Sequence, residues 1–283
     1  MLKWKFSFCF LLVFSAFISQ TLQGYELKLI SKLENVHFEK NYDKAMQLNE
    51  EFKNVLEEAI SNTEIFNFPL DSLSKFMSTE ISPDGNFRIF NWNIELSNQR
   101  QYYECWILMK NLTILKLNDF KNEIPEIENA SLDANSWFGA LYYSIIPKER
   151  KNKTVYTLLG WDGNNMFSNK KIIESMTISK KNKIQFGVPI FKYPNGKTKK
   201  RVIFQYSKQS YMSLKHRQAR KQDYLIFDHL MPPSPHLKEF ADWYVTDLSF
   251  DAFQWNENQW DFKRDFDAKS LKVFKRPFND PNK

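Results

Sequence analysis

The chain contains few cysteines and few glycines. Of its 283 residues, two are cysteines and seven are glycines, whereas lysine, asparagine and phenylalanine are abundant. An A+T-rich genome produces this bias, because the codons of the abundant residues are A/T-rich, so we draw no function from it. Cys9 falls in an apolar N-terminal run that we expect to be removed, which leaves Cys105 as the only thiol and excludes an intramolecular disulfide. The fold must therefore be held by packing, for which about 260 mature residues suffice.

Common catalytic and metal-binding motifs are also missing. The sequence has no H-E-x-x-H zinc pair and no G-x-S-x-G nucleophile elbow. The segment Asp162-Gly163-Asn164-Asn165 gathers oxygen-bearing side chains, but its glycine stands second and no glutamate occupies the twelfth position, so it fails the calcium-loop pattern. Asp-Gly and Asn-Asn favour tight turns with positive backbone angles. We therefore predict a turn here, and neither a metal nor a cofactor for the protein.

The N-terminus carries the pattern of a secretory signal peptide. Lys3 and Lys5 precede an apolar run over residues 6–18, and the polar Ser19-Gln20-Thr21 follows. This run is shorter than the roughly 20 apolar residues that cross a bilayer, and no stop-transfer segment follows it, so we expect no transmembrane segment. We predict a signal peptide over residues 1–24, with a competing cleavage site near Ser19, and a soluble mature protein that is exported to the periplasm or secreted.

Positive charge is concentrated in short runs between apolar-rich segments. Removal of Lys3 and Lys5 lowers the formal charge from +7 to +5. The runs are residues 148–153, 180–183, 197–201 and 215–221. One interpretation is solvated hairpin tips, because clusters of one sign at turns keep strand edges soluble. The functional interpretation is contact with an anionic envelope surface, such as phospholipid headgroups or acidic glycan. Nucleic acid is not an expected partner of an exported protein.

The spacing of the apolar residues changes once along the chain. Over residues 41–60 they recur every three or four positions, which predicts an amphipathic helix with Lys53 on its polar face. Beyond the turn dipeptide Asp84-Gly85, short segments rich in aromatic and β-branched residues alternate with short polar gaps, which favours antiparallel meanders. We predict a mainly β (α+β) fold, in which a helical segment over residues 25–80 packs on an antiparallel β-domain over residues 81–283. The pattern leaves barrel and sandwich open, and also the oligomeric state.

Few residues can carry acid–base chemistry. Asp228-His229 combines a carboxylate with an imidazole, which are the usual proton carriers, and Asp162 completes the only set that we find plausible. If the protein is an enzyme, these three residues are its expected catalytic set. The structural interpretation is that Asp228 accepts hydrogen bonds from a turn. Cys105 lies in the middle of an apolar strand with no histidine near it in sequence, and we expect an inert core thiol.

Three tryptophans stand where a predicted strand runs into a polar turn. They are Trp92, Trp161 and Trp255. Because aromatic faces stack on the apolar faces of sugars, these residues are our candidates for ligand binding. Tryptophans that plug the ends of a barrel or sandwich account for the pattern equally well, and a half-buried core position is the commoner fate of aromatic residues in strands.

Several segments of the chain resemble a known group of proteins. They are residues 82–92, 154–165, 201–206, 212–214 and 226–230. In these segments the chain is similar to a family of uncharacterised exported proteins of Bacteroidota, and the similarity covers most of the mature chain. The resemblance implies a periplasmic or secreted location and says nothing about activity, because it brings no catalytic residue or ligand with it.

Two functions follow as hypotheses. The first is an exported, non-catalytic protein that binds or supports an envelope component, with an anionic envelope surface or glycan as the expected partner. The alternative is a hydrolase that acts on an envelope polymer through Asp162, Asp228 and His229. Convergence of these three side chains in one cleft favours the enzyme, and dispersal favours the binder.

Export is testable without any structure. Fractionation of the native host should recover the protein outside the cytoplasm in a shortened form, because a signal peptidase removes the predicted signal. N-terminal sequencing should find a start between Ser19 and Tyr25. A full-length product in the cytoplasm would overturn the prediction.

Overall fold

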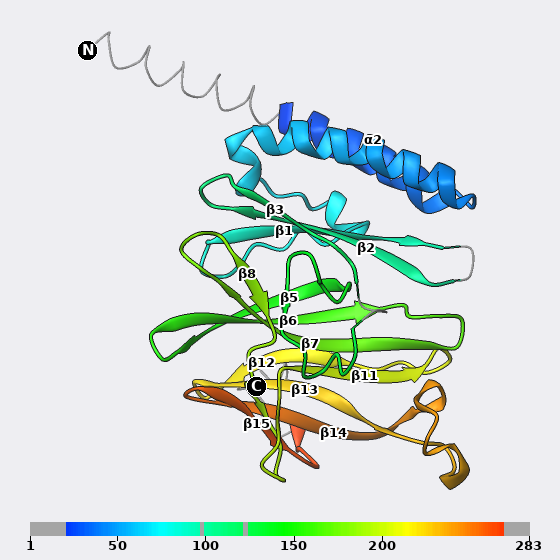
Figure 1. The fold of residues 1–283 in the computed structure, drawn as a ribbon, viewed down its shortest axis with the longest axis vertical. Coiled ribbons are helices and arrows are strands. Elements are labelled where there is room, and N and C mark those ends of the chain that lie inside the picture. The colour runs from blue at the N-terminus through cyan, green and yellow to red at the C-terminus, as the bar shows by residue number, and fades with distance from the viewer. Residues whose placement is uncertain (1–20, 97–98, 121–123, 269–283) are drawn as a thin grey trace, which may run out of the picture. The chain divides into compact units, whose positions relative to one another are not determined.

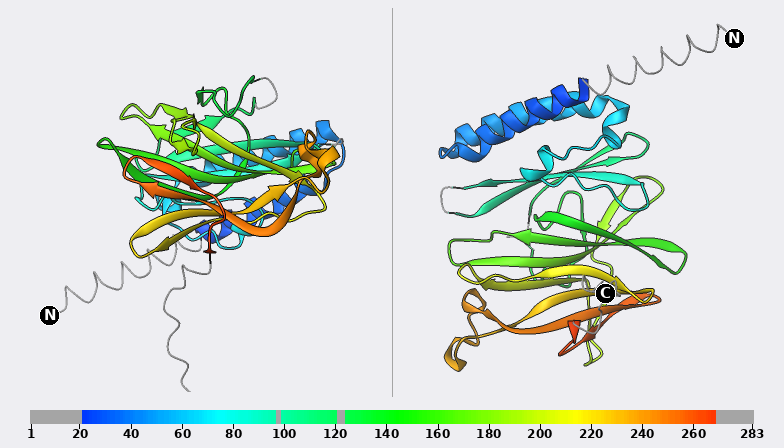
Figure 2. Two further views of the ribbon diagram at one scale, coloured as in Figure 1. Left: turned by 90° about the horizontal axis from the view of Figure 1, so that it is seen from below. Right: turned by 180° about the vertical axis from the view of Figure 1, so that it is seen from behind.

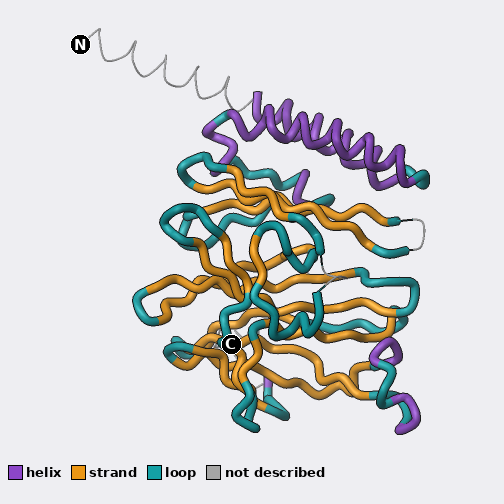
Figure 3. Tube along the Cα trace, in the orientation of Figure 1, coloured by secondary structure: helices purple, strands orange, loops and turns teal. Residues whose placement is uncertain are grey.

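The structure, a computed structural model, describes residues 21–96, 99–120 and 124–268. The chain forms two compact units, residues 1–119 and residues 120–283, which we call the first and the second unit and describe separately. Strands dominate and the long helices lie near the N-terminus, which confirms the predicted mainly β fold with an N-terminal helix (Figures 1 and 3). Residues 1–20, the greater part of the predicted signal peptide, lie outside the described residues.

Two long helices begin the described part of the first unit. The chain is helical over residues 21–38 and again in α2, Tyr42–Ser61. The spacing of apolar residues predicts α2, whereas the helix before it is not among the predicted elements. Its signal is nevertheless present in the sequence, because the buried Leu29, Leu33 and Val36 follow one another at steps of four and three residues.

The start and the apolar face of α2 follow from its sequence. Asn41 caps the helix, with its side-chain oxygen accepting a hydrogen bond from the Lys44 amide at 3.0 Å. The buried residues confirm the predicted stripe and are Ala45, Asn49, Phe52, Leu56, Ala59 and Ile60. Lys53 does not lie on a simply solvated face, because its side chain is mostly buried and its Nζ lies 3.1 Å from Glu104 Oε1. The network of Glu104 therefore anchors the helix to the sheet described next.

A three-stranded antiparallel meander belongs to the same unit. Its strands are β1 (Phe87–Glu95), β2 (Gln101–Met109) and β3 (Ile114–Leu117). Trp92 and Trp106 of the sheet share one apolar core with the helices, and Phe52 packs edge-on against Trp92 with ring centroids 4.9 Å apart. The helices therefore cover one face of this sheet (Figure 2).

A buried arginine fixes the irregular segment between α2 and β1. This segment contains the short turns η1 (Thr63–Phe66) and η2 (Leu73–Lys75). Arg88 donates from Nη1 to the carbonyl oxygens of Ile65 and Phe68 at 2.8 and 2.7 Å. Burial lowers the pKa of Arg88 to about 10, so it stays charged at neutral pH. Helices, segment and meander form one unit, which ends at Asp119 and not at the boundary expected between residues 80 and 81.

The second unit consists of two sheets. Its strands are β4 (Leu132–Asp133), β5 (Leu141–Arg150), β6 (Lys153–Asp162), β7 (Ser168–Ile178), β8 (Ile184–Phe186), β9 (Phe191–Lys192), β10 (Thr198–Lys199), β11 (Arg201–Ser207), β12 (Leu214–Ala219), β13 (Gln222–Met231), β14 (Val245–Asn256) and β15 (Gln259–Lys263). One sheet has the order β4-β8-β7-β6-β5, with β11 paired to β7, and the other has the order β10-β9-β15-β14-β13-β12. The pairs are antiparallel except for β15 with β9, among the strands described. Between β13 and β14 lie η4 (Pro235–Leu237) and η5 (Ala241–Trp243).

The two sheets of the second unit enclose one apolar core. Leu159 and Val202 from the first sheet and Phe227 and Phe253 from the second are buried in it. Face-to-face packing of two mainly antiparallel sheets is a sandwich-like arrangement, one of the two forms that the sequence leaves open. The side chains that point away from this core define an outer face of each sheet.

Packing of α2 on the meander can be tested by one truncation. Phe52→Ala should lower the free energy of unfolding by about 3 kcal/mol, because it removes a fully buried ring from the contact with Trp92. Glu58→Ala, on the exposed face of the same helix, should change it by well under 1 kcal/mol. Equal melting temperatures for the two variants would contradict the packed arrangement.

Candidate functional site

The three candidate ligand-binding tryptophans differ in exposure. Trp92 is 0% exposed, and its Nε1 donates to Asn49 Oδ1 at 2.8 Å. Trp161 is half-buried and hydrogen-bonded to Tyr206. Trp255 is half-buried and packs edge-on against Trp260, with ring centroids 5.2 Å apart. Trp92 therefore cannot stack on a ligand, and its role is in the core of the first unit.

The expected catalytic set is also not assembled. Asp228 and His229 are neighbours on β13, at the point where the pairing of β13 with β14 shifts register between Asp228 and Leu230, so their contacts and not simple alternation describe their side chains. Asp228 Oδ2 accepts a hydrogen bond from the Ser213 amide at 2.7 Å, as its structural interpretation predicts. His229 Nδ1 lies 2.8 Å from Asp251 Oδ2, and Asp251 pairs with the core residue Phe227. Asp228 and His229 are thus held by different partners, Asp228 by the Ser213 amide and His229 by Asp251.

Asp162 belongs to the turn that its sequence predicts. It ends β6 and is fully buried, and its Oδ1 accepts a hydrogen bond from the Asn164 amide at 2.8 Å. Asn164 has a φ of 44°, the positive value that favours asparagine in such turns. The described residues hold no group of three or more histidine, cysteine, aspartate or glutamate side chains that could bind a metal. Cys105 is buried, and burial raises the pKa of its thiol well above the ordinary range.

A cluster that the sequence did not reveal joins the two sheets of the second unit. Asp223 of β13 is hydrogen-bonded to Lys148 of β5, and His216 Nε2 of β12 lies 2.6 Å from Asp223 Oδ1. Burial alone would raise the pKa of Asp223, but the bonds from Lys148 and His216 outweigh it and hold the pKa below the usual range. The three residues are 75 positions apart at most, and only tertiary structure brings them together.

The cationic runs gather at one end of the second unit. Three hairpin turns carry them, between β5 and β6, β7 and β8, and β12 and β13. We name the exposed cations of these turns the basic end: Lys151, Lys153, Lys180, Lys181, Lys183, Arg220 and Lys221. None of their side chains has an ion-pair partner in the described part of the chain. The interpretation as hairpin tips is therefore correct for these residues.

Side-chain contacts and strand registers place the three turns at the same end of the second unit. Lys148 near the end of β5 meets Asp223 near the start of β13, which joins the β5–β6 turn to the β12–β13 turn. Arg150 Nε donates to the Asn258 carbonyl at 2.9 Å, so the β14–β15 turn lies beside them. Because β6 and β7 are antiparallel neighbours, β7 ends where β6 begins, at the same end. In Figure 1 the β5–β6 and β12–β13 turns lie at the left of the second unit, and the β7–β8 turn lies above them on the same side.

Two of the turns hold their residues in an unusual backbone conformation. Lys151 and Asn152 have φ angles of 49° and 60°, and Arg220 and Lys221 have φ angles of 51° and 65°. A two-residue hairpin with positive φ at both positions ordinarily contains Asn-Gly or a similar pair. Arginine and lysine pay a steric penalty there that glycine avoids.

One cationic run, residues 197–201, is a hairpin tip only in part. Lys197 is exposed and lies in the turn between β9 and β10. Further along the run, Lys199 pairs with Glu128 at 2.6 Å, and Arg201 is fully buried and paired with the equally buried Glu174. Burial raises the pKa of Glu174 although Arg201 opposes the shift. The buried end of this run therefore contributes little to the surface charge.

Comparison with known proteins does not assign the chain to a family. No family model matches the chain, and no curated protein matches it. The resemblance to exported proteins of Bacteroidota therefore stays a prediction. Among the described residues, no helix is long and apolar enough to cross a membrane.

The cluster of Asp223 makes a testable contribution to acid stability. A carboxyl whose pKa is depressed by folding stabilises the protein above its unfolded pKa of about 3.9, and this stabilisation is lost as the pH falls through the lower folded value. Asp223→Asn should therefore reduce the free energy of unfolding by about 2 kcal/mol at neutral pH, and by progressively less below pH ~4. Urea titrations from pH 7 to pH 2.5 measure this, with Asp71→Asn on the exposed surface as the control. A constant difference across that range would contradict the assignment.

Proposed function

We propose that the protein is an exported, non-catalytic binder that holds an anionic component of the cell envelope at its basic end. The observation that carries the proposal is the convergence of seven exposed cations on three turns, without ion-pair partners among the described residues. Unpaired cations at one end produce a local positive potential that attracts phosphate or carboxylate groups. Export itself rests on the signal-peptide pattern and on the resemblance stated above.

Arg220 and Lys221 are exposed and adopt positive φ in a turn that suits Asn-Gly better. Residues without a cationic side chain, such as Leu112 and Leu248, adopt positive φ as well, so the backbone conformation by itself does not indicate a function for the charge. It makes these two positions useful for a test, because Asn-Gly removes both the charge and the strain.

The arrangement fits an extended partner better than a compact one. The cations stand on separate hairpin turns and surround no enclosed pocket, so a partner with repeated negative charges can meet several of them at once. An anionic lipid surface and an acidic polysaccharide share this chemistry. The hydrolase alternative has less support, because Asp228 and His229 are each engaged by a different partner, Ser213 and Asp251.

Replacement of the strained cations separates binding from stability. The double variant Arg220→Asn/Lys221→Gly should stabilise the protein by about 1 kcal/mol, because it relieves the positive-φ penalty. It should weaken binding to phosphatidylglycerol vesicles or to an acidic polysaccharide about 30-fold, since each cation near an anionic surface contributes about 1 kcal/mol. Thermal denaturation measures the first effect, and co-sedimentation at low and high salt measures the second.

The matched control removes an exposed lysine from the opposite end. Lys238 lies in the connection between β13 and β14, which begins where Met231 pairs with Val245, far along the strands from Arg220 and Lys221. Lys238→Gln should leave binding unchanged. Unaltered binding by the double variant, or equal loss with Lys238→Gln, would refute the basic end as the binding surface.

A further inference from the structure

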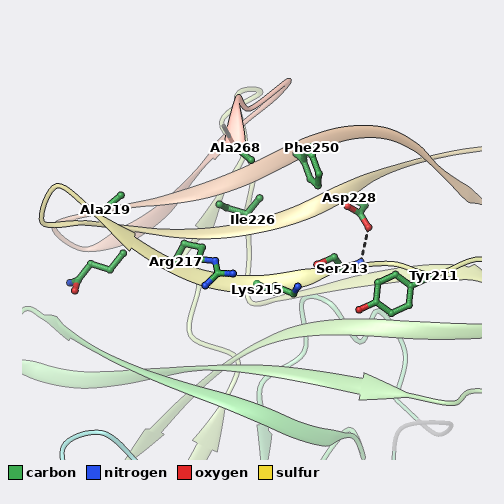
Figure 4. Close-up of a pocket in the computed structure, with 10 residues that line it drawn as sticks. Tyr211, Ser213, Lys215, Arg217, Ala219, Ile226, Asp228, Phe250 and Ala268 are labelled. Atoms are coloured by element: carbon green, nitrogen blue, oxygen red, sulfur yellow. Dashed lines mark hydrogen bonds between the residues drawn. The ribbon is translucent and has the colours of Figure 1, made fainter. Parts of the chain in front are cut away.

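A half-open groove lies on the outer face of β12, β13 and β14. Its volume is about 560 Å³, within the range typical of small-molecule sites. Tyr211, Lys215, Arg217, Ile226 and Phe250 line it together with Asp228 (Figure 4). The groove reaches Ala219, next to Arg220 of the basic end, but its own cations Lys215 and Arg217 lie on β12 and not on the turn.

Strand register explains why these side chains share one face. On β13, Leu225 and Phe227 are buried in the core, so the intervening Ile226 points outward. Lys215 of β12 pairs directly with Ile226, and Arg217 lies two residues further along the same face. Two residues of a strand span about 7 Å, so the two cations form a row along the edge of the groove.

The groove keeps a positive charge. Lys215 and Arg217 are exposed and have no ion-pair partner in the described ranges. Asp228 is the one acidic residue in the lining, and its Oδ2 already accepts the hydrogen bond from the Ser213 amide at 2.7 Å (Figure 4). An anion can therefore approach the two cations without displacing an existing salt bridge.

The rest of the groove is mainly apolar. Ile226 and the ring of Phe250 are half-buried, and Tyr211 is 74% exposed at one end. Apolar surface of this kind gains free energy when a hydrocarbon chain covers it. The polar side chains of the lining, such as Gln218, stand beside this apolar surface, so an anionic sugar is the competing ligand that the test must distinguish.

The geometry points to a binding site for a single-chain anionic amphiphile. In this site Arg217 and Lys215 hold a carboxylate or phosphate, with the planar guanidinium able to bind two oxygens at once. The hydrocarbon chain lies over Ile226 and Phe250. The ligand class is thus a fatty carboxylate or an alkyl phosphate, and neither charge nor chain suffices alone.

Titration of the full chain with matched probes below their micelle concentrations tests the site. Decanoate and decyl phosphate should bind, whereas decanol, which lacks the charge, and butanoate, which lacks the chain, should bind at least tenfold more weakly. The probe that binds more tightly, decanoate or decyl phosphate, shows whether the natural head group is a carboxylate or a phosphate. Arg217→Gln and Lys215→Gln should each weaken decanoate binding at least tenfold without changing the melting temperature, because both side chains are exposed.

Controls distinguish this site from the basic end. Arg220→Asn/Lys221→Gly removes cations of the basic end only and should retain decanoate binding. The groove can therefore be tested even if the basic end proves not to bind an anionic surface. Equal affinity for decanol and decanoate would overturn the proposal, and so would an unchanged affinity after Arg217→Gln. Tighter binding of glucuronate than of decanoate would overturn it in favour of an acidic sugar.

Discussion

Alternation of side chains along β12, β13 and β14 is the constraint on which the second unit depends. Because successive residues point to opposite faces, the burial of Leu225, Phe227 and Phe253 in the core places the intervening side chains on the outer face of the sheet. A slip of one residue would turn Ile226 and Asp228 into the core and expose Phe227. Core packing on one face therefore determines which side chains line the groove on the other face.

The same register brings charges together across long stretches of chain. The side chain of Asp223 lies on the face of β13 opposite the groove. It is hydrogen-bonded to Lys148 and His216, which links the two sheets near the basic end. Glu174 and Arg201 form a second ionic link, fully buried between β7 and β11. Buried ion pairs carry a large desolvation penalty and are weak evidence for stability, but loss of one partner leaves an unpaired charge. Such pairs make the register of the sheets specific.

The two candidate surfaces differ in what they demand of a ligand. The basic end offers charge spread over three turns, which suits a repeated anion and depends on ionic strength. The groove offers two cations beside an apolar wall, which suits one anionic head with an attached chain. Both proposed surfaces carry exposed cations, in keeping with the net positive charge of the chain.

Local pattern was sufficient to predict α2, most strands and the turn at Asp162, because these features depend on apolar spacing and on the conformational preferences of asparagine and glycine. Runs of cations at turns were also visible in the sequence. Their convergence at one end was not, because it depends on contacts such as Arg150 with Asn258, 108 residues apart.

Tertiary structure alone decided the roles of individual polar residues. Lys53 fits a polar helix face, yet Glu104, 51 residues away, draws it against the sheet. Asp228 and His229 are adjacent in sequence but have different partners, because Ser213 and Asp251 come from different parts of the chain. The sequence by itself determined which segments become helix and strand, since that choice is local. The packing of the apolar faces against one another then determined which side chains are in contact and which remain on a surface.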